Sequence, residues 1–228
     1  MRRLLCYLAT CATLAASSAT LALPAAPAQP PAARANPAST YCVAQGGQLA
    51  FEKDGSGGRF GICRFADNRQ CEEWALLRGE CPAGGIRVTG YATPAARYCA
   101  LRGGRYQVLS EGAGAVEQGS CGFANGKSCA APAFFDGLCT PASAGETLRV
   151  PFRCDGGRTL DALFSNGSRS SVSLWLSDGR VLSLPQALSG SGARYANADE
   201  SIVFWNKGRT AFIDEKGRTS YGNCQARP

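Results

Sequence analysis

The sequence of 228 residues contains no histidine. This absence excludes the Ser-His-Asp and Cys-His arrangements of nucleophilic catalysis and the usual catalytic zinc sites. Pairs of adjacent carboxylates remain, such as Asp199-Glu200 and Asp214-Glu215. Neighbouring residues of a strand point to opposite faces, so neither pair provides an acid and a base that face each other. We interpret both pairs as solvated charges of hairpins and expect the protein not to be an enzyme.

Long apolar runs are missing after the first 28 residues. Arg2-Arg3 precede an Ala- and Leu-rich run, and Ala26-Pro27-Ala28 fits an A-x-A cleavage pattern, which predicts a signal peptide over residues 1–28. The alternative is a lipoprotein signal with lipidation at Cys11, although Thr10 is unusual before such a cysteine. No other stretch approaches the roughly 20 residues of a transmembrane helix. We therefore expect a periplasmic or secreted protein with at most a weak association with the envelope.

Clustered positive charge is also missing. Without residues 1–28 the chain has 22 basic and 17 acidic residues, a net charge of +5, but no basic run with interleaved aromatic residues. This pattern argues against a nucleic-acid partner. Gly126-Lys127-Ser128 resembles the end of a phosphate-binding loop, yet Cys121 stands where the first glycine is required. We expect no cofactor.

Cysteine, in contrast, is abundant. Ten of the twelve cysteines follow residue 28, and an even number with regular spacing indicates a disulfide framework in an oxidising compartment. Metal binding is the alternative use of these cysteines. Because the chain has no histidine and no C-x-x-C pair, we expect no metal site.

The chain repeats itself after a Pro/Ala linker at residues 29–35. Residues 36–42 (NPASTYC) align with residues 92–99 (ATPAARYC), and a Gly-Gly pair follows in each copy. Four cysteines recur at offsets of 57 or 58 residues, as Cys42, Cys63, Cys71 and Cys81 in the first copy and Cys99, Cys121, Cys129 and Cys139 in the second. We expect two Cys-rich repeats, at residues 36–82 and 91–140. Units of this size bury little apolar surface and depend on disulfides for their stability.

Within the first repeat, the pattern predicts a short helix from Pro37 to Gln45 and a hairpin of residues 48–51 and 59–65. A second short helix is expected from Cys71 to Arg78. Four cysteines allow three pairings, and the sequence does not decide among them. Our preference is Cys63 with Cys71 across the turn and Cys42 with Cys81 between the ends.

Both copies resemble a small, uncharacterised bacterial domain that carries the label haemolysin, with the pattern NPA...YC...GG...G.C.F...C..W...G.C. The first copy keeps the tryptophan of this pattern as Trp74, whereas the second has Ala131-Pro132 in that region. No segment of either copy has the character of a membrane-inserting or pore-forming element. The label therefore implies no mechanism.

The third module, residues 144–227, is rich in turn signals. They are Asp155-Gly156-Gly157, Asn166-Gly167, Asp178-Gly179, Lys207-Gly208 and Lys216-Gly217. Such dipeptides between alternating segments are typical of hairpins. They separate about eight expected strands, at residues 147–154, 159–164, 171–176, 180–184, 193–197, 201–206, 210–214 and 219–221. Eight short strands favour a small antiparallel β-barrel, because closure removes exposed edges, and the whole protein should be mainly β.

Two features of this module concern its packing. Val172, Leu174 and Leu176 alternate with polar residues, so we expect Trp175 to point outward and to pack against the preceding repeat. Cys154 and Cys224 are the only cysteines of the module and should pair. By the chain-entropy model, a bond that closes a loop of this length contributes roughly 4 kcal/mol.

Two polar segments bracket the strand that contains Ile202 to Trp205. They are Ser189-Gly190-Ser191-Gly192 and Asn206-Lys207-Gly208. Their spacing indicates neighbouring loop tips that offer the Ser191 hydroxyl and the Lys207 ammonium group to a partner.

The motifs around these tips are RCDGG at 153–157, Leu184-Pro185, SGARY at 191–195, FWNKG at 204–208, Ala211 and Cys224. In order and spacing they resemble the signature of the bacterial membrane-bound and periplasmic inhibitors of c-type lysozyme. The resemblance implies an eight-stranded barrel that inhibits host lysozyme, with Ser191 and Lys207 entering the active-site cleft. By motif position, Gly190, Gly192 and Gly208 would shape the loops and Tyr195 would support them.

A different class of function stays open. The chain could be an envelope adhesion or cell-wall-binding protein in which the Cys-rich repeats are the binding modules and the barrel is a spacer.

Overall fold

The computed structural model describes residues 35–110 and 116–227, which belong to one compact unit. The predicted signal peptide, Cys11 and almost all of the predicted linker lie outside the described residues. Within the described ranges, no helix has the length and apolar character needed to cross a membrane.

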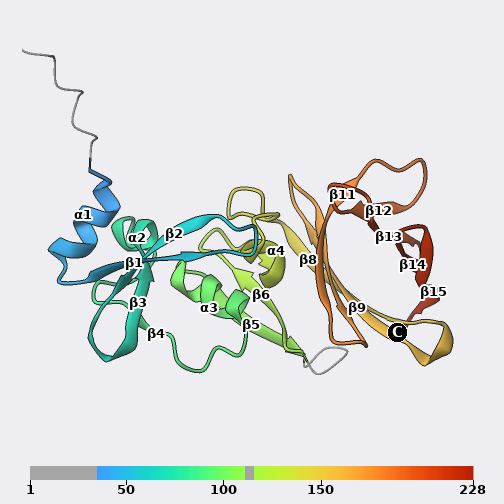
Figure 1. The fold of residues 1–228 in the computed structure, drawn as a ribbon, viewed down its shortest axis with the longest axis horizontal. Coiled ribbons are helices and arrows are strands. Elements are labelled where there is room, and N and C mark those ends of the chain that lie inside the picture. The colour runs from blue at the N-terminus through green and yellow to red at the C-terminus, as the bar shows by residue number, and fades with distance from the viewer. Residues whose placement is uncertain (1–34, 111–115, 228) are drawn as a thin grey trace, which may run out of the picture. The chain divides into compact units, whose positions relative to one another are not determined.

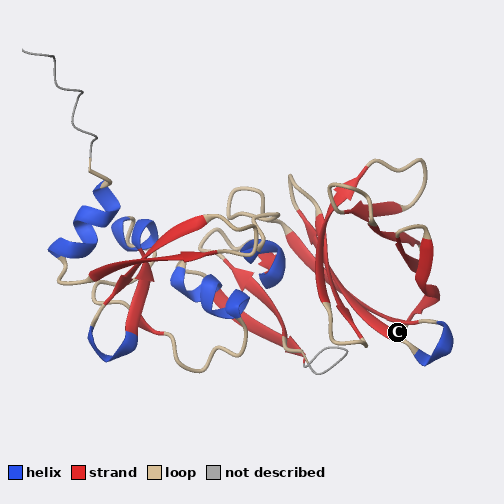
Figure 2. Ribbon diagram, viewed as in Figure 1, coloured by secondary structure: helices blue, strands red, loops and turns tan. Residues whose placement is uncertain are grey.

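The protein is mainly β, as predicted. A four-stranded sheet, a three-stranded sheet and a closed eight-stranded barrel follow one another along the chain (Figure 1). Short helices accompany the two small sheets, whereas the barrel consists of strands with one short helical turn (Figure 2).

The first repeat contains the predicted hairpin and both predicted helices. Its elements are α1 (Pro37–Ala44), β1 (Gln48–Lys53), β2 (Arg59–Arg64), η1 (Ala66–Asn68), β3 (Arg69–Glu72), α2 (Glu73–Leu77) and β4 (Ile86–Arg87). The Asn36 side chain accepts a hydrogen bond from the Ala38 amide and so caps α1. Strands β3 and β4 were not predicted. The second helix begins at Glu73 rather than at Cys71 because Cys71 and Glu72 pair with β2.

The second repeat has the same order of elements. They are α3 (Pro94–Leu101), β5 (Arg105–Ser110), β6 (Gln118–Gly122), β7 (Ser128–Ala130) and α4 (Ala131–Phe135). Its sheet has the order β5-β6-β7, so it matches β1 to β3 of the first repeat.

The disulfides within the repeats differ from our preferred pairing. Cys42 bonds to Cys63 and Cys71 bonds to Cys81, and the second repeat shows the corresponding bonds Cys99–Cys121 and Cys129–Cys139. Cys63 and Cys71 do lie opposite each other on β2 and β3. Each nevertheless bonds to a cysteine beside the sheet, Cys42 on α1 and Cys81 after α2, and the bonds tie the helical layer to the strands.

The barrel confirms the prediction of eight antiparallel strands, which close in the order β10-β11-β12-β13-β14-β15-β8-β9. The strands are β8 (Glu146–Arg153), β9 (Thr159–Asn166), β10 (Ser171–Leu176), β11 (Val181–Ala187), β12 (Ala193–Ala196), β13 (Ile202–Lys207), β14 (Thr210–Glu215) and β15 (Arg218–Ala226). A short turn, η3 (Asp155–Gly157), joins β8 to β9. The Cys154–Cys224 disulfide joins the end of β8 to β15, next to the pairing that closes the barrel.

The outer face of the barrel contacts the second repeat. Trp175 is 1% exposed and belongs to an apolar cluster with Leu163 of the barrel and Phe134 of α4, which confirms the prediction that it packs against the preceding repeat. Beside this cluster, the Gln118 amide donates to Asp161 Oδ2 over 2.8 Å. The barrel and the second repeat therefore share both apolar and polar contacts.

Candidate functional site

Two chain connections lie side by side at one end of the barrel. Residues 188–192 connect β11 to β12, and Gly208-Arg209 connect β13 to β14. Ala193 at the start of β12 pairs with Asn206 near the end of β13, so both connections leave the barrel at the same edge. The structure thus brings together the segments that contain Ser191 and Lys207.

Trp205 of β13 holds the first connection against the barrel. Its indole Nε1 donates a hydrogen bond to the Ser191 carbonyl oxygen over 2.9 Å, and Ser189 Oγ donates to the same oxygen over 2.8 Å. The Trp205 ring is stacked on Phe212, its cross-strand partner, with 6.0 Å between ring centroids. The backbone at Ser191 is therefore held by the outer face of the barrel.

Glycine is required at one position of this segment and not at another. Gly192 has a φ of +72°, and a Cβ there would lie 2.5 Å from the Asn206 carbonyl oxygen. A side chain at Gly190 would meet no atom within 4 Å. Close approach of the two connections therefore depends on Gly192, whereas nothing in the surroundings of Gly190 demands a glycine.

The second connection is a tight turn with its own hydrogen bonds. Thr210 Oγ1 donates to the Lys207 carbonyl oxygen over 2.9 Å, and Asn206 Nδ2 donates to the Thr210 carbonyl oxygen over 3.1 Å. Gly208 adopts a φ of +58°, which favours glycine. These contacts fix the backbone from which the Lys207 side chain extends.

The side chains of Ser191 and Lys207, the two loop tips, are both available to a partner. Ser191 and Lys207 are exposed. Among the residues that the structure describes, neither the Ser191 hydroxyl nor the Lys207 ammonium group has a hydrogen-bond or ion-pair partner. A donor that has no internal partner can be used fully in an intermolecular contact.

The two tips border a groove of about 1270 Å³ on the outer face of β13, β14 and β15. Trp205 and Phe212 give it an aromatic wall, and Asp155, Asp214 and Asn223 give it polar groups. This aromatic wall was not predicted from the sequence. A signal for it was present in Phe204-Trp205, because adjacent strand residues face opposite sides and Phe204 occupies the barrel core.

Tyr195 lies in the core and not in the groove. It is 3% exposed and packs against Phe164 and Phe204, with ring centroids 5.7 and 6.2 Å away. Burial raises the pKa of its phenol. Tyr195 therefore contacts the interior side of the strand pair that presents the two tips.

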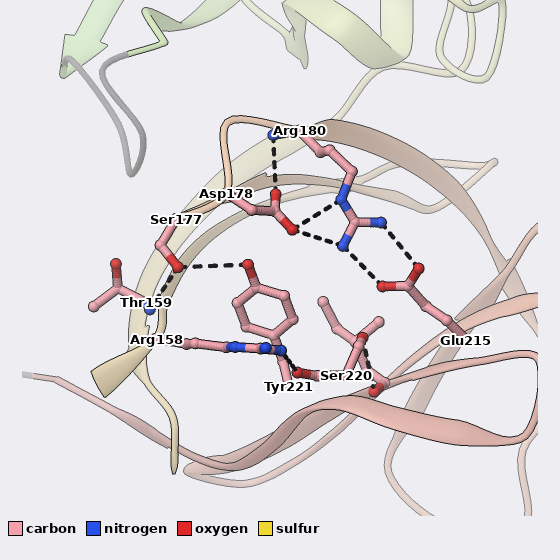
Figure 3. A network of polar contacts seen from close by, with 9 residues as sticks. Arg158, Thr159, Ser177, Asp178, Arg180, Glu215, Ser220 and Tyr221 are labelled. Atoms are coloured by element: carbon pink, nitrogen blue, oxygen red, sulfur yellow. Dashed lines mark hydrogen bonds and ion pairs between the residues drawn. The ribbon is translucent and has the colours of Figure 1, made fainter. Parts of the chain in front are cut away.

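The opposite end of the barrel is held by a polar network (Figure 3). The Arg180 guanidinium donates two hydrogen bonds to the Glu215 carboxylate, each of 2.9 Å, and another to Asp178. These bonds lower the pKa of Glu215 and of Asp178. Ser177 and Tyr221 join the network through a 3.4 Å contact between their hydroxyl groups. Glu215 and Tyr221 of this network lie on β14 and β15, two of the strands that carry the groove.

The carboxylate pairs are also engaged in structural contacts. Glu215 binds Arg180, and Glu200 binds Arg194. Glu200 stands in a turn at a φ of +54° and not on a strand, so the alternation expected for Asp199-Glu200 does not apply there. In the part of the chain that the structure covers, no group of three or more acidic or cysteine residues could hold a metal ion.

The groove and its two tips make the barrel a module suited to binding another molecule, and comparisons with known proteins identify its class. Residues 152–220 match the family described as membrane-bound lysozyme-inhibitor of c-type lysozyme. Residues 33–80 and 90–137 each match a domain of unknown function, DUF333.

Two relatives carry the name membrane-bound lysozyme inhibitor of C-type lysozyme. The protein of Escherichia coli K12 is 42% identical over 80 residues, which cover 35% of this chain and 69% of that protein. The protein of Yersinia enterocolitica is 39% identical over 80 residues, and this chain spans only 62% of its length. The crystal structure of Pseudomonas aeruginosa MliC in complex with hen egg white lysozyme matches with 28% identity and a TM-score of 0.33, over 40% of this chain and 92% of that chain.

The chain belongs to the family of membrane-bound inhibitors of c-type lysozyme through its C-terminal barrel, and two copies of DUF333 precede that barrel. The name of this family describes membrane-bound inhibitors of an enzyme.

Proposed function

We propose that the barrel, residues 144–227, inhibits host c-type lysozyme in the periplasm and so protects the cell wall. Residues 188–192 and the turn at Lys207-Gly208 enter the active-site cleft of the enzyme. The observation that carries this proposal is the pair of unpartnered donors, Ser191 and Lys207, held side by side on a barrel of this family.

The chemistry of the two tips suits such a cleft. A lysozyme cleft contains two catalytic carboxyl groups, one protonated and one ionised. The Lys207 ammonium group can donate to the ionised carboxylate, and the Ser191 hydroxyl can donate to or accept from the neighbouring group. Hydrogen bonds to charged groups contribute roughly 1.5 to 3 kcal/mol each. Both contacts would occupy space that the sugar substrate needs.

Long-range attraction does not assist this association. The barrel has 11 basic and 8 acidic residues, a net charge of +3, and lysozymes of this type are generally basic. Like charges slow the encounter of two proteins, above all at low salt. Affinity must therefore come from local fit, and the hydrogen bonds that hold both tips in place support that fit by reducing the entropy lost on binding.

The test is Lys207→Ala, measured as the inhibition constant against hen egg white lysozyme in a turbidity assay. Loss of one partner from a buried charged pair costs about 2 to 5 kcal/mol, so we expect inhibition to weaken about 30-fold or more. The matched control is Lys216→Ala, which removes the exposed lysine of the Lys216-Gly217 turn at the other end of β14. This control should inhibit normally, and both variants should melt near the native temperature.

If Lys207→Ala inhibits lysozyme as strongly as the native chain does, the proposal is wrong. Equal loss in both lysine variants would show that overall charge matters rather than the position of Lys207.

A further inference from the structure

Corresponding clefts of the two repeats have different neighbours. In the second repeat, Gly119 and Pro132 line a cavity of about 270 Å³ that Trp175 of the barrel also lines. Their counterparts in the first repeat, 58 positions earlier, are Gly61 and Trp74, and these line an open groove of about 330 Å³. Residues of the barrel thus line the cleft of the second repeat, whereas the groove of the first repeat is lined by residues of the two repeats alone.

The open groove displays two aromatic side chains to solvent. Phe51 is 51% exposed and Trp74 is 39% exposed. Large apolar side chains at this level of exposure are unusual when they gather in one groove, and such patches commonly mark binding sites. In the second repeat, Val108 and Pro132 occupy the positions of Phe51 and Trp74, so the aromatic pair belongs to the first repeat alone.

The groove also offers a cation. The Arg59 guanidinium lies 4.6 Å from the centre of the Phe51 ring. Within residues 35–110 and 116–227, Arg59 has no ion-pair partner, so its N–H groups are free for a ligand. A guanidinium stacked on a ring keeps its planar donors available for two parallel hydrogen bonds to a carboxylate. The second repeat has Glu117 at this position, which reverses the charge.

The acidic residues of the groove are occupied internally. Glu72 accepts from the Ala75 amide over 2.9 Å and pairs with Arg102 of the second repeat. Glu73 accepts from Ser39 Oγ over 2.6 Å and from the Asn36 side chain over 3.0 Å. Both glutamates are at most 4% exposed. Because both glutamates are buried and engaged, the exposed charge that a ligand meets at the rim is the Arg59 guanidinium.

We propose that the groove of Phe51, Arg59 and Trp74 binds an anionic glycan built of amino sugars that carry carboxylate groups, which is the chemistry of peptidoglycan. The apolar C–H face of a pyranose ring suits an exposed aromatic face, and the carboxylate suits the guanidinium. The groove is open to solvent and therefore admits a strand of sugars. This site would hold the protein on the cell wall, and it acts independently of the inhibitory barrel.

The experiment is cosedimentation of the full chain with purified peptidoglycan sacculi, without lysozyme, followed by competition with soluble disaccharide-peptide fragments. We expect Trp74→Ala and Arg59→Ala each to weaken binding at least tenfold, and Trp74→Phe to retain most of it. Matched controls are Val108→Ala, which truncates the counterpart of Phe51, and Lys216→Ala, which removes one positive charge from the barrel. Both should bind as the native chain does.

The proposal is overturned if both Trp74→Ala and Arg59→Ala bind sacculi as strongly as the native chain does. It is also overturned if the two control variants lose as much binding as these two variants. Competition by a neutral oligomer of N-acetylglucosamine as effective as that by the carboxylate-bearing fragments would overturn the assignment of an anionic ligand. Thermal unfolding of each variant separates loss of binding from loss of folding. Because lysozyme inhibition by Trp74→Ala should stay normal, failure here is distinguishable from failure of the proposed inhibitory function.

Discussion

Replacement of Trp205 by Phe tests whether the indole N–H positions the Ser191 segment. The substitution keeps an aromatic ring against Phe212, although a smaller one, and removes the donor that bonds to the Ser191 carbonyl oxygen over 2.9 Å. If residues 188–192 must be ordered before they enter a lysozyme cleft, loss of this bond makes binding less favourable, because ordering is then added to the cost of association.

The expected magnitude follows from a single hydrogen bond. A typical intramolecular hydrogen bond contributes about 0.5 to 1.5 kcal/mol, which corresponds to a roughly 2- to 12-fold weaker inhibition constant. The same loss should lower the melting temperature by no more than about 6 °C, because 1 kcal/mol shifts a protein of this size by about 2 to 4 °C. The variant therefore stays folded in a turbidity assay with hen egg white lysozyme at 25 °C.

Trp74→Phe is the matched control, since it makes the same chemical change in the first repeat and should leave inhibition unchanged. If Trp205→Phe inhibits like the native chain while Lys207→Ala does not, the reasoning about the indole is refuted. The lysine would then act without an ordered Ser191 segment.

Three further perturbations test the contacts that hold the barrel and its loops in place. Gly192→Ala should weaken inhibition and lower the free energy of unfolding by about 1 kcal/mol or more, because Gly192 has a positive φ and lies close to the Asn206 oxygen. Gly190→Ala is the control and should change neither inhibition in the turbidity assay nor stability in urea unfolding. Replacing Cys154 and Cys224 by Ala should lower the free energy of unfolding by about 4 kcal/mol, because that disulfide closes a loop of 70 residues. Replacing Cys71 and Cys81 should lower it by about 2.7 kcal/mol, because that loop spans 10 residues. Equal losses in denaturant unfolding would contradict the dependence on loop length. Because Arg180 lowers the pKa of Glu215, that pair stabilises the barrel above the ordinary glutamate pKa of 4.5 and loses its effect as the pH falls through the lower folded value. Glu215→Gln should remove up to about 1 kcal/mol at pH 6 and flatten the acid dependence of the melting temperature, and an unchanged acid profile would count against this role.

The barrel was predictable from the sequence because its turns are local. Dipeptides such as Asp178-Gly179 set the chain reversals, and alternation in Ser171–Leu176 separated core from surface and identified Trp175 as outward-facing. The last strand was predicted as residues 219–221 but extends over Arg218–Ala226. Its final residues pair with β8, more than 70 positions earlier, and a pairing so distant in sequence leaves no local signal.

The disulfide pairing of the repeats was not predicted, because the residues that make room for it are recognised only in the structure. Each repeat has a Gly-Gly pair after its first helix. The first glycine, Gly46, ends the helix at a φ of +77°, whereas a Cβ at the second, Gly47, would lie 2.2 Å from Cys63 Sγ. Gly104 has the same relation to Cys121 Sγ, at 2.3 Å. The second glycine thus makes room for the bridge between the first two cysteines, a role that only a three-dimensional arrangement reveals.

The contacts on either side of the second repeat also show why the two copies are not interchangeable. Strand β2 of the first copy places Phe60 against Tyr98 of the second, with ring centroids 5.1 Å apart. The counterpart of Phe60 is Gln118, which donates to Asp161 of the barrel and accepts from Arg149 over 3.0 Å. If the first repeat stood next to the barrel, a phenyl ring would replace that amide, and Asp161 and Arg149 would each lose one hydrogen bond while keeping their mutual ion pair. A hydrogen bond to a charged group contributes roughly 1.5 to 3 kcal/mol. Divergence at this one face therefore favours the observed order of the modules. The copy with Gln118 contacts the barrel, and the copy with Phe60 packs against the second repeat.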